Sequence, residues 1–120
     1  MIKKTLVIGA STNPSRYSYR AMQQLIANGH LVIGIGKKEG EVHGVKITAN
    51  KISYEDVDTV TLYLSKKNQQ EYYDYIIGLN PKRVLFNPGT ENEELENLLT
   101  KHHIAYEEAC TLVLLSTGQY

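Results

Sequence analysis

The chain has 120 residues, of which 42% are apolar and 22% are charged, a composition typical of a globular protein with one buried core. Lys and Arg together number 13, as do Asp and Glu, so the charge balance gives no footprint for binding nucleic acid or a membrane surface. With a single cysteine, no secretory cleavage site and no apolar run near the ~20 residues of a membrane span, we expect one cytoplasmic domain over residues 1–120.

In chain order, short apolar runs alternate with stretches of helical periodicity. The apolar runs predict strands over residues 4–8, 31–35, 45–47, 59–64, 83–86 and 104–106, and a loop over 37–44. Apolar residues at helical spacing predict three helices, with stripes at Met22/Leu25/Ile26, Tyr72/Ile76/Leu79 and Leu95/Leu98/Leu99. A further apolar run over 110–115 is too crowded to stay exposed.

Helix starts are predicted where Ser, Thr or Asn is followed three residues later by an acid. This spacing occurs at Ser53–Asp56, where it predicts a single helical turn, and at Asn68–Glu71 and Thr90–Glu93. The Asn28-Gly29 and Asn80-Pro81 pairs predict two helix ends. The alternation predicts an α/β fold in which parallel strands carry helices on both faces, joined by right-handed crossovers.

The turn after the first strand is the candidate ligand site, because nucleotide phosphates dock at that turn in open α/β sheets. It reads Gly9-Ala-Ser-Thr-Asn-Pro, with one glycine where the dinucleotide fingerprint requires three. Its small residues still let a phosphate approach, and Ser11, Thr12 and Asn13 add side-chain donors. The alternative is an ordinary loop that caps the helix through Ser15.

The end of the second strand bears on which nucleotide is bound. NAD-binding folds carry an acid there, which accepts a hydrogen bond from the ribose 2′-hydroxyl. This chain has Gly34-Ile-Gly36-Lys37-Lys38 instead. Two lysines suit a phosphate on the ribose, as in NADP or in the 3′-phosphate of coenzyme A, and a solvated basic loop is the alternative. Together the two segments favour a phosphorylated adenine nucleotide.

Several segments, in their order and spacing, resemble the small stand-alone CoA-binding proteins, which are related in fold to the N-terminal domain of the succinyl-CoA synthetase α subunit. These segments are Gly9-Ala-Ser-x-Asn-Pro-x-Arg-Tyr17, Leu25-x-x-x-Gly-His30, Gly44, Asn87-Pro-Gly-Thr-Glu-Asn-Glu-Glu94 and the cysteine near the C-terminus. The resemblance covers nearly the whole chain. It implies a Rossmann-like three-layer α/β/α domain with a mainly parallel sheet of about five strands, which binds coenzyme A at their carboxyl ends.

By position, the resemblance also implies three groups of contacts to coenzyme A. They are Gly9, Ala10, Ser11 and Asn13 at the diphosphate, with Arg16 and Tyr17 nearby; Lys37 or Lys38 at the 3′-phosphate; and Leu64, Ser65 and Lys66 beside the adenine or pantetheine. The synthetase relatives phosphorylate a histidine in a second domain. We expect no such domain here, so their chemistry is not carried over.

The residues themselves predict neither a catalytic site nor a metal site. The four histidines are scattered, without the spacing of metal ligands. Cys110 is the only candidate nucleophile, but Glu107 and Glu108 before it disfavour a thiolate, which favours a buried, inert cysteine. We therefore expect a protein that binds coenzyme A or an acyl-CoA without catalysis of its own. The alternatives are an NADP-binding reductase-like protein and an interaction module of the same fold that binds no ligand.

The tyrosines at 72, 73 and 75 bear on self-association. At helical spacing Tyr72, Tyr73 and Tyr75 cannot all face the core, so at least one is expected to point outward. An outward ring is either solvated or part of a homodimer surface, since tyrosine is enriched in interfaces.

Overall fold

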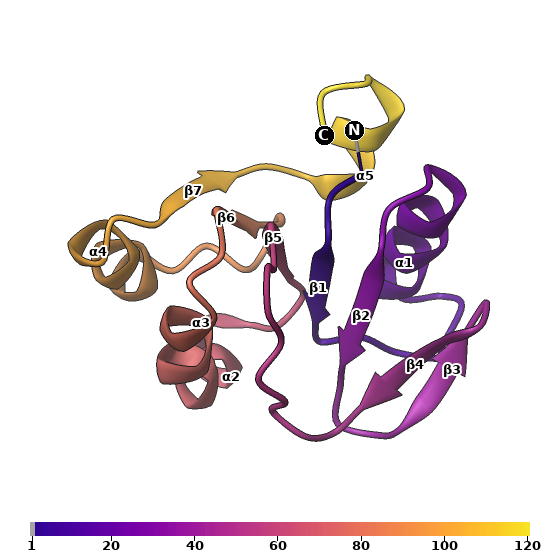
Figure 1. The fold of residues 1–120 in the computed structure, drawn as a ribbon, viewed down its shortest axis with the longest axis horizontal. Helices are drawn as coiled ribbons and strands as arrows, with labels where there is room; N and C mark the ends of the chain where they lie inside the picture. The colour runs from indigo at the N-terminus through magenta and orange to yellow at the C-terminus, as the bar shows by residue number, and fades with distance from the viewer. Residues whose placement is uncertain (1) are drawn as a thin grey trace.

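The computed structural model describes residues 2–120 and contains one seven-stranded sheet with helices on both faces (Figure 1). The strands are β1 (Thr5–Ile8), β2 (Val32–Ile35), β3 (Gly40–Val42), β4 (Val45–Thr48), β5 (Thr59–Leu62), β6 (Arg83–Phe86) and β7 (Ala105–Glu108). The helices are α1 (Tyr17–Ala27), α2 (Lys66–Gln69), α3 (Tyr73–Leu79), α4 (Glu93–Lys101) and α5 (Thr111–Ser116), with a 3₁₀ turn η1 (Gln70–Tyr72) between α2 and α3.

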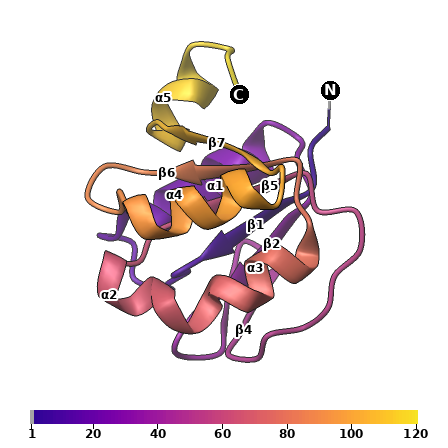
Figure 2. The same ribbon diagram turned by 90° about the vertical axis from the view of Figure 1, so that its left-hand side faces the viewer.

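The sheet order is β3-β4-β2-β1-β5-β6-β7, and every neighbouring pair is parallel except β3 with β4. Helices α2, α3 and α4 cover one face, and α1 and α5 cover the other (Figures 1 and 2). Strand β1 is buried on both faces: Leu6 and Ile8 share a core cluster with Ile76, whereas Val7 packs with Met22. Because β1, β2, β4, β5, β6 and β7 run parallel, their carboxyl ends lie together at one edge of the sheet.

The predicted α/β class and the mainly parallel sheet are confirmed, but the strand count of about five is wrong, since the sheet has seven strands. The strand that the sequence did not reveal is β3, which lies in the expected loop. It has three residues and only one core side chain, Val42, so it leaves no periodic pattern. A tight turn at His43 and Gly44, both with positive φ, folds it back onto β4.

The first two predicted helix starts are wrong. Residues 53–56 contain a bend at 55–56 rather than a helical turn, and Asp56 has a φ of 56°. The next helix begins three residues earlier than expected, at Lys66 behind Ser65. Its early start is fixed by the buried Gln69 side chain, which donates to the backbone oxygens of Leu64 and Thr90.

The third predicted helix start, at Thr90, is also wrong. Helix α4 begins at Glu93, and its cap is Asn92, whose Oδ1 accepts from the Leu95 N–H. The Thr90 hydroxyl instead donates to the Asn87 carbonyl at 2.7 Å. This bond lies within the loop after β6 and occupies the hydroxyl that the Ser/Thr-x-x-acid spacing assigns to the helix cap.

The three tyrosines all reach the core, so the expectation that one of them points outward is wrong. Tyr72 is 8% exposed, and Tyr73 and Tyr75 are half-buried against the same core cluster. The 3₁₀ turn ends at Tyr72, where it breaks the helical periodicity on which the expectation rested. The apolar run over 110–115 is a short helix whose Val113 is 55% exposed, so it is not wholly buried as expected.

One carboxylate of α4, that of Glu96, is buried. Glu96 is 9% exposed, and within residues 2–120 its Oε2 has no hydrogen-bond partner. Burial raises the pKa of Glu96 to about 7, and the neighbouring Glu108 carboxylate adds to the effect. Since the ordinary value is 4.5, the folded protein holds a proton here between about pH 4.5 and 7 that the unfolded chain has already released.

Stability should therefore fall as the pH rises from about 4.5 through about 7, because the stabilising species is protonated Glu96. The variant Glu96→Gln is uncharged at every pH. It is expected to raise the free energy of unfolding by about 1–2 kcal/mol at about pH 8, with little change at about pH 5. Urea unfolding at the two pH values tests this, with Glu41→Gln on β3 as the control. An equal effect of Glu96→Gln at both pH values would contradict it.

Candidate functional site

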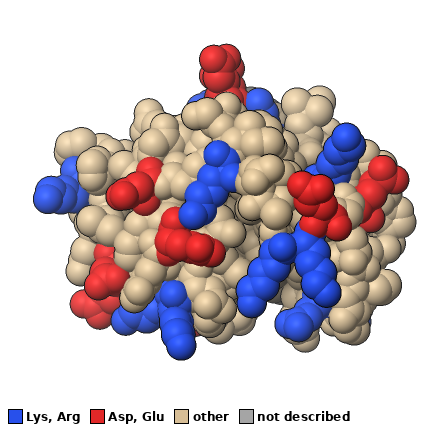
Figure 3. Space-filling view, turned by 90° about the horizontal axis from the view of Figure 1, so that it is seen from below, with Lys and Arg blue, Asp and Glu red and all other residues tan. Residues whose placement is uncertain are grey.

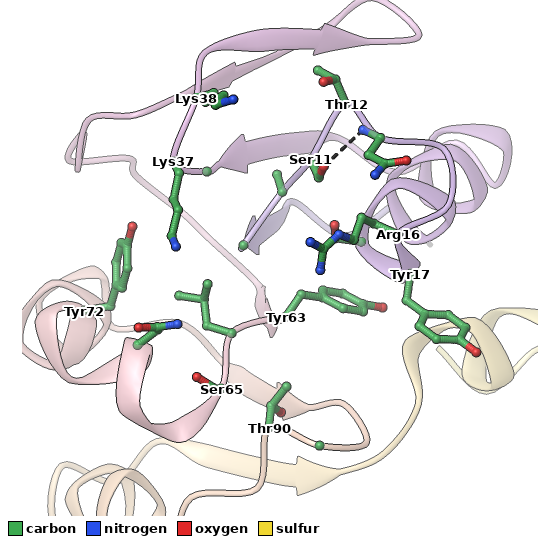
Figure 4. Close-up of a pocket in the computed structure, with 18 of the residues that line it drawn as sticks. Ser11, Thr12, Arg16, Tyr17, Lys37, Lys38, Tyr63, Ser65, Tyr72 and Thr90 are labelled. Atoms are coloured by element: carbon green, nitrogen blue, oxygen red, sulfur yellow. Dashed lines mark hydrogen bonds between the residues drawn. The ribbon is translucent and has the colours of Figure 1, made fainter.

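The main cleft of the molecule lies at the carboxyl edge of β1, β2, β5 and β6, the edge at which open α/β sheets bind ligands. Its volume is about 810 Å³, and it is enclosed by the four loops that follow these strands (Figure 4). Figure 3 looks onto this edge from below Figure 1 and shows Lys and Arg side chains standing among Asp and Glu.

Most of the residues expected at a ligand site come together in this cleft. Those that line it are Gly9, Ala10, Ser11, Thr12, Asn13, Arg16, Tyr17, Lys37, Lys38, Leu64 and Ser65. Lys66 does not line it and is exposed at the first residue of α2. Lining residues that sequence reasoning missed include Ser18, Gly36, Tyr63, Glu71 and Tyr72. Of these, Gly36 and Tyr63 directly follow strands, which is the signal that could have identified them.

Gly9 and Ala10 hold the loop in place. Their N–H groups both donate to the Ile35 carbonyl, at 2.8 and 2.9 Å, so these two amides serve the sheet rather than a ligand. Gly9 has a φ of +92°, and a Cβ there would lie 2.8 Å from the Tyr63 carbonyl oxygen. A glycine is therefore required for β1 and the loop after β5 to approach each other.

The next residues form a turn that is closed by their own side chains. The Ser11 hydroxyl accepts from the Asn13 N–H at 3.0 Å, and Asn13 Oδ1 accepts from both the N–H and the hydroxyl of Ser15. The Ser11 O–H and the Asn13 NH₂ group are left as donors. Within residues 2–120, the backbone N–H groups of Ser11 and Thr12 have no protein partner.

The N-terminus of α1 opens into the cleft without a cap. Its N-cap residue is Arg16, which makes no side-chain capping bond, so the alternative in which Ser15 caps the helix is wrong. The first turn contains no acid, and Ser18 in that turn lines the cleft. Helix α4 shows the opposite arrangement, with a capping Asn92 and three acids in its first turn. The exposed amides and the helix dipole of α1 therefore favour an anion in the cleft.

Basic side chains flank this helix end. Arg16 and Lys37 extend toward the centre of the cleft from opposite sides, whereas the Tyr17 ring is turned outward (Figure 4). Glu71 is the acidic residue among those that line the cleft, and its Oε2 lies 4.0 Å from Lys51 Nζ. The positive side chains outnumber the negative one, which suits a ligand with more than one phosphate.

The loop after β6, which lines the cleft with residues 88–90, begins in a buried polar network centred on Asn87. Asn87 Nδ2 donates to Thr61 Oγ1 at 2.7 Å and to the Leu62 carbonyl at 2.9 Å, and its Oδ1 accepts from the Thr111 N–H at 2.8 Å. The Thr61 and Thr111 hydroxyls lie 2.8 Å apart. Every polar atom of the Asn87 side chain is thus paired, so the network fixes the loops after β5 and β6.

A second set of buried amides fixes α2. Besides its bonds to the Leu64 and Thr90 carbonyls, Gln69 accepts from Asn92 Nδ2 at 2.8 Å through its Oε1. Asn92 also donates to the Tyr73 hydroxyl at 2.8 Å. The wall of the cleft formed by α2 is thereby tied to the loop that precedes α4.

Tyr63 borders the cleft, but burial raises the pKa of its hydroxyl far above the ordinary range, and this oxygen is buried without a partner within residues 2–120. Cys110 is half-buried at the start of α5 and does not line the cleft. In the described part of the chain, no three His, Cys, Asp or Glu residues are grouped to hold a metal ion. None of the described helices is long and apolar enough to span a membrane.

Comparisons with known proteins bear on the family of the chain. A family model described as "CoA binding domain" matches residues 3–116. A crystal structure described only as an uncharacterized protein is 49% identical, with a TM-score of 0.97, covering 100% of this chain and 99% of its own. A hypothetical protein from Pyrococcus horikoshii OT3 is 25% identical, with a TM-score of 0.87 and coverage of 97% and 83%. A conserved hypothetical protein from Pyrococcus furiosus is also 25% identical, with a TM-score of 0.83 and coverage of 93% and 98%. Among curated proteins there is no match.

Proposed function

Because the chain belongs to the CoA-binding domain family, whose model covers residues 3–116, we propose that it binds coenzyme A in the cleft and performs no chemistry of its own. The observation that supports this most strongly is the uncapped, acid-free N-terminus of α1, which opens between Arg16 and Lys37. A diphosphate placed there would accept hydrogen bonds from the backbone N–H groups that have no protein partner.

The proposed binding mode places the diphosphate on the N–H groups of Ser11 and Thr12 and on the first turn of α1. Arg16 adds a charged donor to the same anion, and each such hydrogen bond contributes about 1.5–3 kcal/mol. The 3′-phosphate lies toward Lys37, on the opposite side of the cleft. The Leu64 and Ser65 backbone then borders the adenine or the pantetheine.

The identity of the ligand is tested by thermal unfolding in the presence of CoA, dephospho-CoA, NADP and NAD. The proposal predicts a larger rise in Tm with CoA than with dephospho-CoA, because only CoA carries the 3′-phosphate. A rise with NADP and none with CoA would replace the proposal by an NADP-binding function. No rise with any of the four would leave a domain that binds none of these nucleotides.

The lysine assignment makes a separate prediction. Lys37→Ala should weaken CoA binding by about 1–3 kcal/mol, or roughly 5- to 150-fold, because a charged hydrogen bond to the 3′-phosphate is lost. The affinity for dephospho-CoA should change by less than about threefold. Titration calorimetry measures both, and Lys67→Ala is the control because Lys67 is exposed on α2 and does not line the cleft. Equal losses for the two ligands would show that Lys37 contacts a different group.

A further inference from the structure

The loop after β1 lies against two glycines of the neighbouring segment. A Cβ on Gly36 would collide with the Ala10 carbonyl oxygen, and a Cβ on Gly40 would lie 2.5 Å from Thr12 Cγ2. Neither glycine has a positive φ, so both are required by space and not by backbone conformation. They bracket the Lys37-Lys38 segment, so this contact joins the two loops that carry the candidate phosphate-binding groups.

The hairpin formed by β3 and β4 is the fixed partner in this contact. Its Val42 is 1% exposed and belongs to the core cluster that contains Met22 of α1. The His43 ring at its tip lies 5.9 Å from the Tyr19 ring, also on α1. Thr12, in contrast, is exposed and points toward the hairpin and away from the centre of the cleft (Figure 4). A collision at Gly40 would therefore displace Thr12 and not the hairpin.

We propose that Gly40 is a positioning residue for the ligand loop. Without a Cβ, it lets the Thr12 methyl group lie against the hairpin, and this contact fixes the direction of the Ser11 and Thr12 N–H groups beside the α1 N-terminus. The statement that this loop binds CoA rests on the proposed function. The steric coupling between the hairpin and the loop is independent of the ligand, so the coupling and the binding of CoA are tested separately.

Three variants isolate the contact. Gly40→Ala introduces the Cβ, Thr12→Ser removes the methyl group while keeping the hydroxyl, and the double variant contains both changes. Gly78→Ala is the matched control, because a Cβ at Gly78 on α3 meets no atom within 4 Å. Gly36→Ala is not used, since its Cβ would strike backbone and disturb the fold.

The first readout needs no ligand: it is the set of backbone amide NMR signals from residues 11–13. Gly40→Ala should move these signals, and adding Thr12→Ser should return them toward their positions in Thr12→Ser alone, because the colliding methyl is gone. Gly78→Ala should leave them in place. Signals that do not respond to Gly40→Ala, or that stay displaced in the double variant, would overturn the coupling.

The second readout is the affinity for CoA, measured by calorimetry. Gly40→Ala should weaken binding by about fivefold or more, since misplaced donors lose much of their contribution. The double variant should bind within about twofold of Thr12→Ser, a non-additive result expected of residues in contact. Unchanged affinity in Gly40→Ala, with its amide signals moved, would overturn the positioning role. If the unmodified protein binds no CoA, the proposed function fails, and the ligand-free amide signals alone decide the coupling.

Discussion

Replacing Ser18 by aspartate is expected to weaken CoA binding by about 100-fold or more, equivalent to roughly 3 kcal/mol. Ser18 lies in the first turn of α1 and lines the cleft. A carboxylate there would satisfy the same N–H groups that the proposal assigns to the diphosphate, and it would repel that anion. Ser18 is 4% exposed, so the charge that favours the helix N-terminus is also partly removed from water, and urea unfolding of each variant accompanies the binding measurement.

The matched control is Ser18→Asn, which has the shape of aspartate without its charge. This variant should keep most of the CoA affinity, because its neutral amide neither repels the diphosphate nor competes strongly for the amides. Calorimetry with the unmodified protein, Ser18→Asp and Ser18→Asn separates the effect of the added charge from the effect of the larger side chain. Equal losses in Ser18→Asp and Ser18→Asn would assign the effect to bulk, and unchanged binding in Ser18→Asp would place the diphosphate elsewhere.

Replacing Asn87 by alanine is expected to lower the free energy of unfolding by about 3 kcal/mol. The side chain is 3% exposed and makes three hydrogen bonds, to Thr61, Leu62 and Thr111. Its removal strands the Leu62 carbonyl and the Thr111 N–H in the interior, where an unpaired polar group costs about 1–3 kcal/mol. For a domain of this size the expected fall in Tm is roughly 10 °C.

The control for this prediction is Asn28→Ala. Asn28 also donates through its side chain, to the Gln24 carbonyl at 2.7 Å, but it is exposed at the end of α1. Water can replace that bond, so the change should stay within about 0.5 kcal/mol. Urea unfolding of both variants gives the comparison. A cost below about 1 kcal/mol for Asn87→Ala would mean that water fills the network.

The fold class could be predicted because the buried parallel strands are continuous apolar runs. The run that ends in Phe86 was placed at its observed bounds, and β1 differs from its expected range only at Lys4. What failed were the features set by tertiary contacts. Asn92 caps α4 while its own NH₂ group donates to Gln69 and Tyr73, and no local spacing encodes those partners. The short strand β3 was not predicted because its single core residue, Val42, produces no alternation of apolar and polar residues.

The location of the candidate site was also predictable, since the loops after β1, β2 and β5 must meet at one edge of a parallel sheet. The sequence could not show which backbone N–H groups of the first loop are free to bind a ligand. Gly9 and Ala10 were expected to hold the diphosphate, but both donate to the Ile35 carbonyl. The N-cap at Arg16 and the contribution of Ser18 likewise depend on the observed start of α1.

The most direct test of the central claim is a titration of the ¹⁵N-labelled protein with CoA, followed through its backbone amide signals. The account predicts that the largest changes occur at Ser11, Thr12 and Ser18, with further changes at Lys37 and Ser65. These residues all line the cleft. Changes confined to other surfaces, such as a second pocket lined by Gln24 of α1 and Val113 of α5, or no change at saturating CoA, would contradict it.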